Sequence, residues 1–439
     1  MKHSIPLLFV LVPALGFSQA QVKKIDESIS GQKAAYESWY KHLHANPELS
    51  TMEEKTAAYL KKELLSMGYE ITDSMGYHSF AAVLRNGKGP VVLYRTDMDG
   101  LPLKELTNLD YASKVQVKRG EETVSAMHAC GHDIHMSSWL GTARAMAEMK
   151  SLWTGTLILL AQSAEETGQG AKKVVASPAF RSLPKPDIQL AFHDHAELLT
   201  GQAGFCDGFA MAATDMLNIT FYGKGGHGAV PQQAIDPVLL AAQFVTAIQS
   251  IVSRNLSPND PAVITVGAIN GGTVGNIIPD QVTLKLTIRS YSKESRELIF
   301  NRLKTIGNNL AAAAGLEKDR MPVFDLLDMS IPSVYNDPIL GERLRNNLVA
   351  KLGEQSVTKV QPIMIGEDFG IYGQQESRIP SYLVWIGTVS PERKELARQG
   401  KTELPSLHSP RFAPDYQSAI PGAVRVMTNS LMDLMPKQK

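Results

Sequence analysis

The sequence predicts an α/β fold whose main domain has a mainly parallel sheet, with a smaller ferredoxin-like α+β domain inserted into it. In the outer parts of the chain, short continuous apolar runs alternate with helical patterns, as in a parallel sheet covered on both faces. The middle of the chain instead reads strand, helix, strand, strand, helix, strand, which is the ferredoxin-like order. In such parallel sheets the ligand site lies beyond the carboxyl ends of the strands.

The outer parts of the chain supply the elements of the main domain. Apolar residues at helical spacing from 34 to 67, interrupted at Pro47, predict a helix, a turn and a second helix. Four β-rich runs, each ending in polar residues, predict buried strands at 90–96, 156–162, 188–192 and 382–386. Helical patterns at 136–149 and 338–352 separate these strands.

The middle of the chain supplies the inserted domain. Residues 216–222 alternate between apolar and polar like a half-buried strand, and residues 237–254 have the pattern of an amphipathic helix. The remaining elements are strands at 263–268, 282–288 and 321–327 and a helix at 294–314. We therefore expect a main domain in two parts, 21–212 and 329–439, around an inserted domain at 213–328.

The composition narrows the class of partner. The chain has 439 residues, with 44 basic and 44 acidic side chains and 44% hydrophobic residues, which is ordinary for a globular protein. A formal net charge of zero argues against the basic surface of a nucleic-acid binder. We therefore expect small molecules or further subunits as partners, and no nucleic acid.

The first 20 residues have the pattern of a cleaved secretory signal. Lys2 precedes an apolar run at 5–17, and Ser18 and Ala20 place small residues where a signal peptidase cuts. The run is shorter than the ~20 residues of a spanning helix, although an uncleaved anchor is the alternative. We expect cleavage after Ala20, a secreted or periplasmic protein and no stable membrane anchor.

The densest group of metal-ligand types is Met-His-Ala-Cys-Gly-His-Asp-Ile-His at 127–135. The thiolate of Cys130 and the imidazole of His132 suit zinc or a similar transition metal, and Gly131 allows the tight turn that points both inward. Two alternatives remain at this point. Cys130 could be a buried cysteine beside histidines that begin a helix, or it could form a disulfide with Cys206, which otherwise has the small, apolar neighbours of a core residue.

Two adjacent carboxylates, Glu165 and Glu166, follow the predicted strand at 156–162. Neighbouring side chains at a strand end point in opposite directions, so one carboxylate can bind metal while the other faces the substrate. Metal-assisted hydrolysis needs this division, because one group holds the ion and the other moves the proton. A pair of solvated surface glutamates is the alternative.

Further histidines follow two other predicted segments of the main domain. His193 and His195 come at the end of the strand at 188–192, with a carboxylate between them, and His408 lies near the C-terminus. A single histidine is more often a core or surface residue than a ligand. Several histidines at one edge of a sheet favour a metal site.

Seven stretches of the chain form an ordered set of motifs. They are RTDMDGLP at 95–102, HACGHD at 128–133, AEE at 164–166, GGHGA at 225–229, GGTVGNIIP at 271–279, GEDF at 366–369 and LHSP at 407–410. In this order they resemble the aminoacylase and carboxypeptidase family of metallohydrolases. The resemblance is closest to the amidohydrolase branch that includes hippurate hydrolases and indole-acetyl-amino-acid hydrolases. Asp194, His195 and Ala196 depart from the family's usual residues after His193.

The resemblance implies a divalent metal cofactor, as one or two ions, with zinc or manganese favoured and cobalt also suited. It implies that five residues bind the metal: Cys130, His132, Glu166, His193 and His408. Glu165 would then be the general base and acid of the reaction.

The resemblance also assigns roles to the inserted domain, as a lid and as the surface of a homodimer. His227 would stabilise the oxyanion in the closed form, often in the site of the partner subunit. Asn276 and Arg289 would contact the carboxylate of the substrate, a task that suits the bidentate fork of arginine.

We therefore interpret the chain as a secreted or periplasmic metal-dependent amidohydrolase or carboxypeptidase. Its substrate would be an N-acyl-amino acid or a small peptide. One enzymatic alternative uses Cys130 as a nucleophile with His132 or His128 as its base. A non-enzymatic alternative is a secreted solute-binding protein or a non-catalytic homologue.

Overall fold

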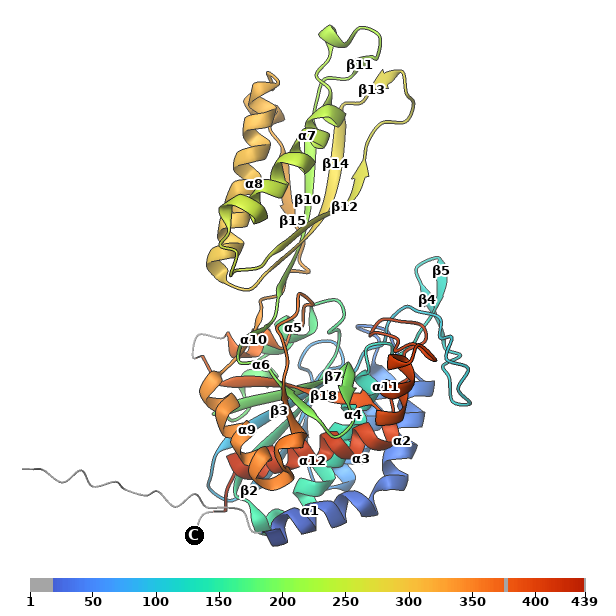
Figure 1. Ribbon diagram of the computed structural model, residues 1–439, viewed down its shortest axis with the longest axis vertical. Coiled ribbons are helices and arrows are strands. Elements are labelled where there is room, and N and C mark those ends of the chain that lie inside the picture. The colour runs from blue at the N-terminus through green and yellow to red at the C-terminus, as the bar shows by residue number, and fades with distance from the viewer. Residues whose placement is uncertain (1–18, 375–377, 438–439) are drawn as a thin grey trace, which may run out of the picture.

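A computed structural model describes residues 19–374 and 378–437 of the chain (Figure 1). Most of the expected signal, residues 1–18, lies outside the described residues. Gln19 and Ala20 begin the first described helix, α1 (Gln19–Gly31).

The main domain contains an eight-stranded mixed sheet that confirms the predicted α/β class. From one edge to the other, its strands are β1 (Glu70–Thr72), β2 (Phe80–Asn86), β6 (Gly155–Gln162), β3 (Val91–Asp97), β7 (Ile188–Leu199), β18 (Ser381–Val389), β8 (Ala203–Phe205) and β17 (Val357–Lys359). The four central strands pair in parallel, whereas β2 and β8 run antiparallel to them. The four strands expected from sequence are the four central ones.

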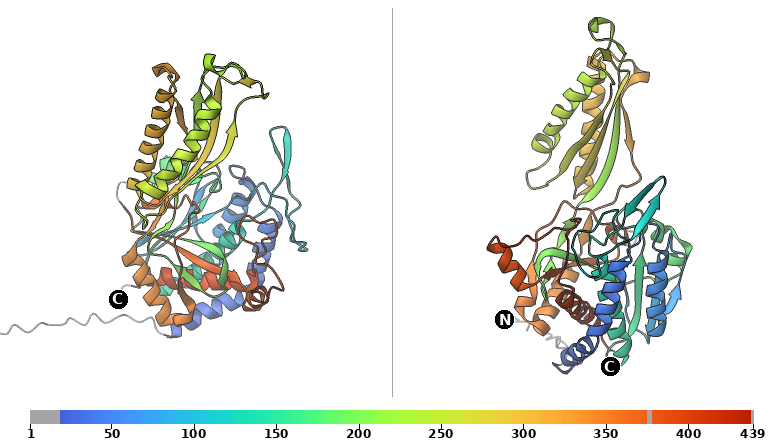
Figure 2. Two further views of the ribbon diagram at one scale, coloured as in Figure 1. Left: turned by 45° about the horizontal axis from the view of Figure 1, so that its top comes forward. Right: turned by 90° about the vertical axis from the view of Figure 1, so that its right-hand side faces the viewer.

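Helices cover both faces of this sheet (Figures 1 and 2). One face packs against α1, α2 (Lys33–Ala45), α3 (Glu54–Ser66), α4 (His132–Glu148), α9 (Pro338–Leu352) and α12 (Tyr416–Leu434). The other face packs against the shorter α5 (Gly170–Ala176), α6 (Pro178–Arg181) and α10 (Gly370–Gly373). This two-sided cover explains why the central strands are continuous apolar runs.

Strand β7 is longer than its sequence suggested. We expected a strand that ends at Phe192, but β7 continues to Leu199 and pairs with β18 up to His195 and, after a register shift, again at Leu199. The histidines of this segment therefore lie within a strand. Because side chains alternate along a strand, His193 and His195 project to one face and Asp194 to the other.

The inserted domain has the predicted ferredoxin-like order. Its elements are β10 (Ala213–Tyr222), α7 (Pro237–Ser250), β12 (Val263–Asn270), β14 (Gln281–Ser290), α8 (Lys293–Ala313) and β15 (Val323–Leu326). The strands form an antiparallel sheet in the order β12, β14, β10, β15, and both helices pack on one face of it (Figure 1). Every second residue of β10 is buried, as its alternating sequence predicted.

Helix α7 continues as a π-helical turn, Ile251–Asn255. Together, Pro237–Asn255 is the one helix among the described residues that is long and apolar enough to cross a membrane. Leu240, Phe244 and Ile248 are buried in the core of the inserted domain, so α7 serves as a core helix there.

Small elements surround these two units. A hairpin of β4 (Gln116–Arg119) and β5 (Glu122–Ser125) projects from the main domain to the same side as the inserted domain (Figures 1 and 2). Two further pairs of short strands are β9 (Gly208–Met211) with β16 (Val334–Asn336) and β11 (Gly226–His227) with β13 (Ile277–Ile278). Helix α11 (Pro391–Arg398) precedes the loop that carries His408.

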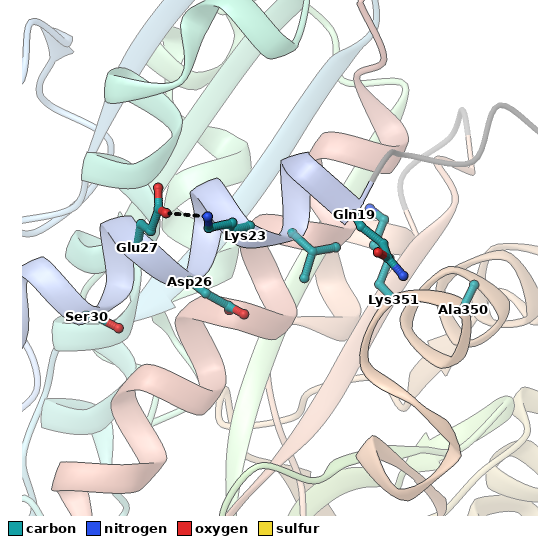
Figure 3. Close-up of a pocket in the computed structure, with 8 residues that line it drawn as sticks. Gln19, Lys23, Asp26, Glu27, Ser30, Ala350 and Lys351 are labelled. Atoms are coloured by element: carbon teal, nitrogen blue, oxygen red, sulfur yellow. Dashed lines mark ion pairs between the residues drawn. The ribbon is translucent and has the colours of Figure 1, made fainter.

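A surface groove of about 600 Å³ lies between α1 and α9 (Figure 3). Lys23 and Glu27 form an ion pair along its α1 wall, with 3.7 Å between Nζ and Oε1. None of the sequence-predicted site residues lines it.

Candidate metal centre

The candidate site lies at the carboxyl edge of the central strands, where the sequence predicted it. Asp97 ends β3 and Gln162 ends β6, which leads into the turn with Glu165 and Glu166. His132 is the first residue of α4, and His193 lies in the adjacent strand β7. His408 enters from the C-terminal part of the chain, with its backbone N–H donating to the carbonyl of Ala129 at 2.8 Å.

Gly131 makes the turn between Cys130 and His132 feasible. Its φ of 78° lies in the left-handed region, and a Cβ built on it would be only 2.3 Å from Oδ2 of Asp194. Both conditions require glycine at this position. The turn brings the potential ligand atoms of Cys130 and His132 within 4.8 Å of each other.

The five predicted ligands converge. The Sγ of Cys130 lies 3.6 Å from Nε2 of His193 and 3.3 Å from Nε2 of His408. The Oε2 of Glu166 lies 3.5 Å from Nε2 of His408, and Oε1 of Glu166 lies 3.9 Å from Nε2 of His132. One thiol, three imidazoles and one carboxylate therefore face a common centre.

These residues fit a divalent metal. The Nε2 of His132 and Oε1 of Glu166 are buried and make no hydrogen bond among the described residues. Buried polar atoms are almost always paired, so two such atoms aimed at one centre indicate a bound cation. Sulfur, imidazole and carboxylate donors are those that zinc and similar ions accept.

Backbone carbonyls orient two of the imidazoles. The Nδ1 of His132 lies 2.8 Å from the carbonyl oxygen of Asp99, and Nδ1 of His193 lies 2.9 Å from that of Asp194. Each carbonyl accepts the Nδ1 proton and leaves Nε2 free for a metal.

Glu165 is buried beside this centre. Its carboxylate, that of Glu166 and the ring of His132 have potential ligand atoms within 4.8 Å of one another. Burial, followed by the nearby carboxylates of Glu367 and Glu166, raises the pKa of Glu165 well above its usual range. Such an environment favours a carboxylate that accepts and returns a proton.

A buried charge network lies beneath the carboxylate pair. Arg95 is fully buried and donates to Oδ2 of Asp97 at 2.7 Å, Oε1 of Glu367 at 2.9 Å and Oδ1 of Asp368 at 3.0 Å. Gln162 also accepts from Arg95, at 3.1 Å, and donates to Asp368 at 2.8 Å. The resemblance rests in part on the stretches 95–102 and 366–369, but no pattern within the sequence predicts that they contact each other.

Both cysteines are free in the structure. Cys206 belongs to the apolar core on the face of the sheet near Met211 and Trp385, as its neighbours in sequence suggested. Burial, followed by the Glu166 carboxylate, raises the pKa of the Cys130 thiol well above its usual range. His128, the alternative base, is itself fully buried, and burial lowers its pKa to about 4.

None of the three predicted residues of the inserted domain has a recorded contact with the metal ligands among the described residues. His227 and Asn276 are exposed at the end of this domain far from the main sheet, where the backbone of Gly228 donates to the carbonyl of Asn276 at 2.9 Å (Figure 1). Arg289 lies at the opposite end, beside Thr214 and Gly366. Within one chain, the structure thus unites the five ligands with Glu165 but does not bring these three residues to them.

His195 is also outside the ligand set. It packs against Trp385 with ring centroids 5.4 Å apart, and its Nδ1 accepts the backbone N–H of Glu197 at 3.2 Å. Its neighbour on the same face of β7, His193, contacts the same indole at 5.4 Å.

The fold and this site together define a metal-dependent hydrolase: a set of converging metal ligands, of which His408 is exposed, adjoins a buried carboxylate at the edge of an α/β sheet. Residues 93–404 match peptidase family M20/M25/M40. The chain belongs to this family, which confirms the resemblance seen in its motifs.

Similar proteins extend this assignment. The chain is 34% identical to N-acetylcysteine deacetylase of Bacillus subtilis (strain 168) over 80% of its own length and 87% of the relative's. It is 35% identical to N-acetyldiaminopimelate deacetylase of Listeria innocua serovar 6a over 89% and 96% of the two chains. It is 32% identical to IAA-amino acid hydrolase ILR1-like 4 of Arabidopsis thaliana, over 85% of its own length and 79% of the relative's.

Solved structures share the whole architecture. A putative aminohydrolase from methicillin-resistant Staphylococcus aureus superposes with a TM-score of 0.82 and 26% identity, over 94% of this chain and 99% of that one. A Bacillus subtilis protein described as a dinuclear metal-binding peptidase of the M20 family superposes with a TM-score of 0.75 and 28% identity. This match covers 92% of this chain and 99% of that one. Both similarities cover the main and the inserted domain.

Proposed function

We propose that the chain is a secreted or periplasmic amidohydrolase that cleaves the amide of an N-acyl-amino acid or a small peptide. The observation that carries the proposal is the convergence of Cys130, His132, Glu166, His193 and His408 beside the buried Glu165. The names of the relatives support the substrate class, because each describes an acyl group linked to an amino acid.

In this proposal, the chain's own residues divide the reaction between them. A divalent ion held by the five ligands would polarise the amide carbonyl and lower the pKa of a coordinated water. Glu165 takes a proton from the attacking water and returns it to the departing nitrogen. Asn276 and Arg289 bind the carboxylate of the substrate, and His227 stabilises the oxyanion.

Zinc or manganese is the proposed ion, and cobalt also suits the donor set. Cys130 belongs to two groups of converging ligand atoms, one with His132 and His193 and one with Glu166 and His408. A shared thiolate between two groups favours two ions. The relative described as dinuclear supports this number.

The test is a hydrolysis screen of the purified chain over hippurate, N-acetyl-amino acids and dipeptides, with metal analysis of the same sample. We expect release of the free amino acid, loss of activity on treatment with a chelator and recovery on addition of zinc or manganese. A thiol enzyme would instead be insensitive to the chelator and inactivated by alkylation. Tight binding without hydrolysis across the panel would favour a solute-binding protein or a non-catalytic homologue.

A homodimer formed through the inserted domain is also proposed. Since His227 and Asn276 lie at the far end of this domain, a partner subunit is the means by which they reach a metal centre. Val238 and Leu239 of α7 are 44% and 57% exposed, and β12 is an edge strand that pairs only with β14 among the described residues. Light scattering should give the mass of two chains, and a monomer would contradict the proposal.

Export with cleavage after Ala20 is proposed from the sequence of the first 20 residues. N-terminal sequencing of the protein recovered from its natural host should begin at Gln21. Recovery of the intact N-terminus from the cytoplasmic fraction would contradict export.

A further inference from the structure

The turn that carries Glu165 and Glu166 has a strained backbone. Ala164 has a φ of 56°, in the left-handed region that non-glycine residues seldom adopt. Such a conformation persists only where surrounding groups enforce it. The direction of both glutamates depends on this turn, because they are the next two residues of the chain.

Two buried acids hold this turn from outside. The Oε1 of Glu53 accepts the backbone N–H of Ala164 at 2.7 Å, and Oδ2 of Asp99 accepts that of Glu166 at 3.0 Å. Within the turn, the carbonyl of Ala164 accepts from the backbone N–H of Gly170 at 3.0 Å. Glu53 is wholly buried, although it precedes a helix in a polar stretch of sequence.

The loop between α2 and α3 brings Glu53 to the turn. The carbonyl of Glu48 accepts the backbone N–H of Gly100 at 2.7 Å, and Ser50 donates its hydroxyl to Oδ2 of Asp99 at 2.6 Å. The loop is therefore fixed to the segment after β3, directly beside the turn after β6. Glu53 is the residue of this loop that contacts Ala164.

We propose that Glu53 is a positioning residue for amide hydrolysis, because its hydrogen bond to Ala164 fixes the left-handed turn and thereby the direction of Glu165 and Glu166. The inference rests on the proposed function and adds a residue to it. Glu53 acts through the backbone of the turn and contacts neither the ligand side chains nor the reacting atoms.

The turn requires from the side chain of Glu53 a hydrogen-bond acceptor at the right position, and it does not require a negative charge there. Burial, followed by the neighbouring Asp99, raises the pKa of Glu53 to about 8. A glutamine has the same length and keeps a carbonyl oxygen for the N–H of Ala164. An aspartate keeps the carboxyl group but is too short by one methylene.

The test compares three variants of the metal-loaded enzyme at saturating metal, on whichever of N-acetyl-L-cysteine, N-acetyl-L-methionine and hippurate the wild type hydrolyses fastest. We expect Glu53→Gln to keep kcat within about threefold of wild type. For Glu53→Ala we expect a loss in kcat of about 100-fold, the size of effect that a misplacement of ~1 Å produces. Glu53→Asp should fall between them, and KM should change by less than about threefold in all three.

Glu48→Ala is the matched control. The side chain of Glu48 lies in the same loop but accepts from the backbone N–H and hydroxyl of Thr56 at the start of α3. Its removal should lower the melting temperature and leave kcat unchanged. If Glu53→Ala does not fold, the difference in kcat between Glu53→Gln and Glu53→Asp tests the inference in its place.

Two results would overturn the inference: Glu53→Ala with a kcat near that of wild type, or Glu53→Gln as impaired as Ala. Failure of the proposed function looks different. In that case the wild type hydrolyses no substrate of the panel, or Glu165→Gln remains active.

Discussion

Replacement of Glu165 by glutamine is expected to lower kcat by roughly 10²–10⁴-fold, the range attributed to general acid–base catalysis. Glutamine has the shape of glutamate, so it fits the buried position beside His132 and Glu166 without disturbing the ligands. It cannot accept a proton from water or return one to the leaving nitrogen. Turnover should therefore fall while the metal content per chain stays the same.

The matched control is Glu166→Gln, one residue along the same turn. Glu166 faces His408 and His132 with its two oxygens, so the amide should weaken metal binding and activity together. Metal analysis and initial rates on the same samples separate the two cases. Retention of more than a tenth of wild-type kcat by Glu165→Gln would remove Glu165 from the mechanism.

The second large effect is on stability, in Arg95→Met. Arg95 is buried among the carboxylates of Asp97, Glu367 and Asp368, with 0–1% of each of these side chains exposed. Removal of one member of a buried ionic network leaves its partners uncompensated, which costs about 3–5 kcal/mol. We expect a loss of this size in the free energy of unfolding of the metal-free protein, measured by denaturant titration.

Arg85→Met provides the comparison for Arg95. Arg85 lies in strand β2 of the same sheet and pairs with Glu70, but their side chains are 52% and 72% exposed. Exposed ion pairs contribute about 0–1 kcal/mol because solvent screens them. Similar losses in both variants would show that the buried network is not a major source of stability.

Much of the fold follows from local sequence patterns. The central strands β3, β6 and β18 are continuous apolar runs, and β10 alternates as a half-buried strand does, so each was predicted from its own residues. Strand β2 was missed because its buried segment includes Ala81 and Ala82, which have low strand propensity. The three-residue strands β8 and β17 were missed because they are too short to show a period.

The candidate site was likewise predicted in part: residues close together in sequence were recognised, and residues far apart were not. Cys130 and His132 are close in sequence, so their chemistry is visible in one stretch of the chain. The supporting residues are not: Arg95 and Glu367 are 272 positions apart, and Glu53 and Ala164 are 111 apart. An acidic residue just before a helix is usually a solvated residue at the helix start. Glu53 is buried because the loop between α2 and α3 packs against the turn after β6, which is distant in sequence.

The ligand set also links metal uptake to the completion of folding. Cys130 and His408 are 278 positions apart, and the whole inserted domain is synthesised between them. A growing or truncated chain therefore lacks one donor until its last segment has packed against the sheet. Contacts of such long range form late because loop closure opposes them. Metal binding then favours the finished chain over all partly folded forms, and under the proposed export the ion is acquired where folding ends and not where translation takes place.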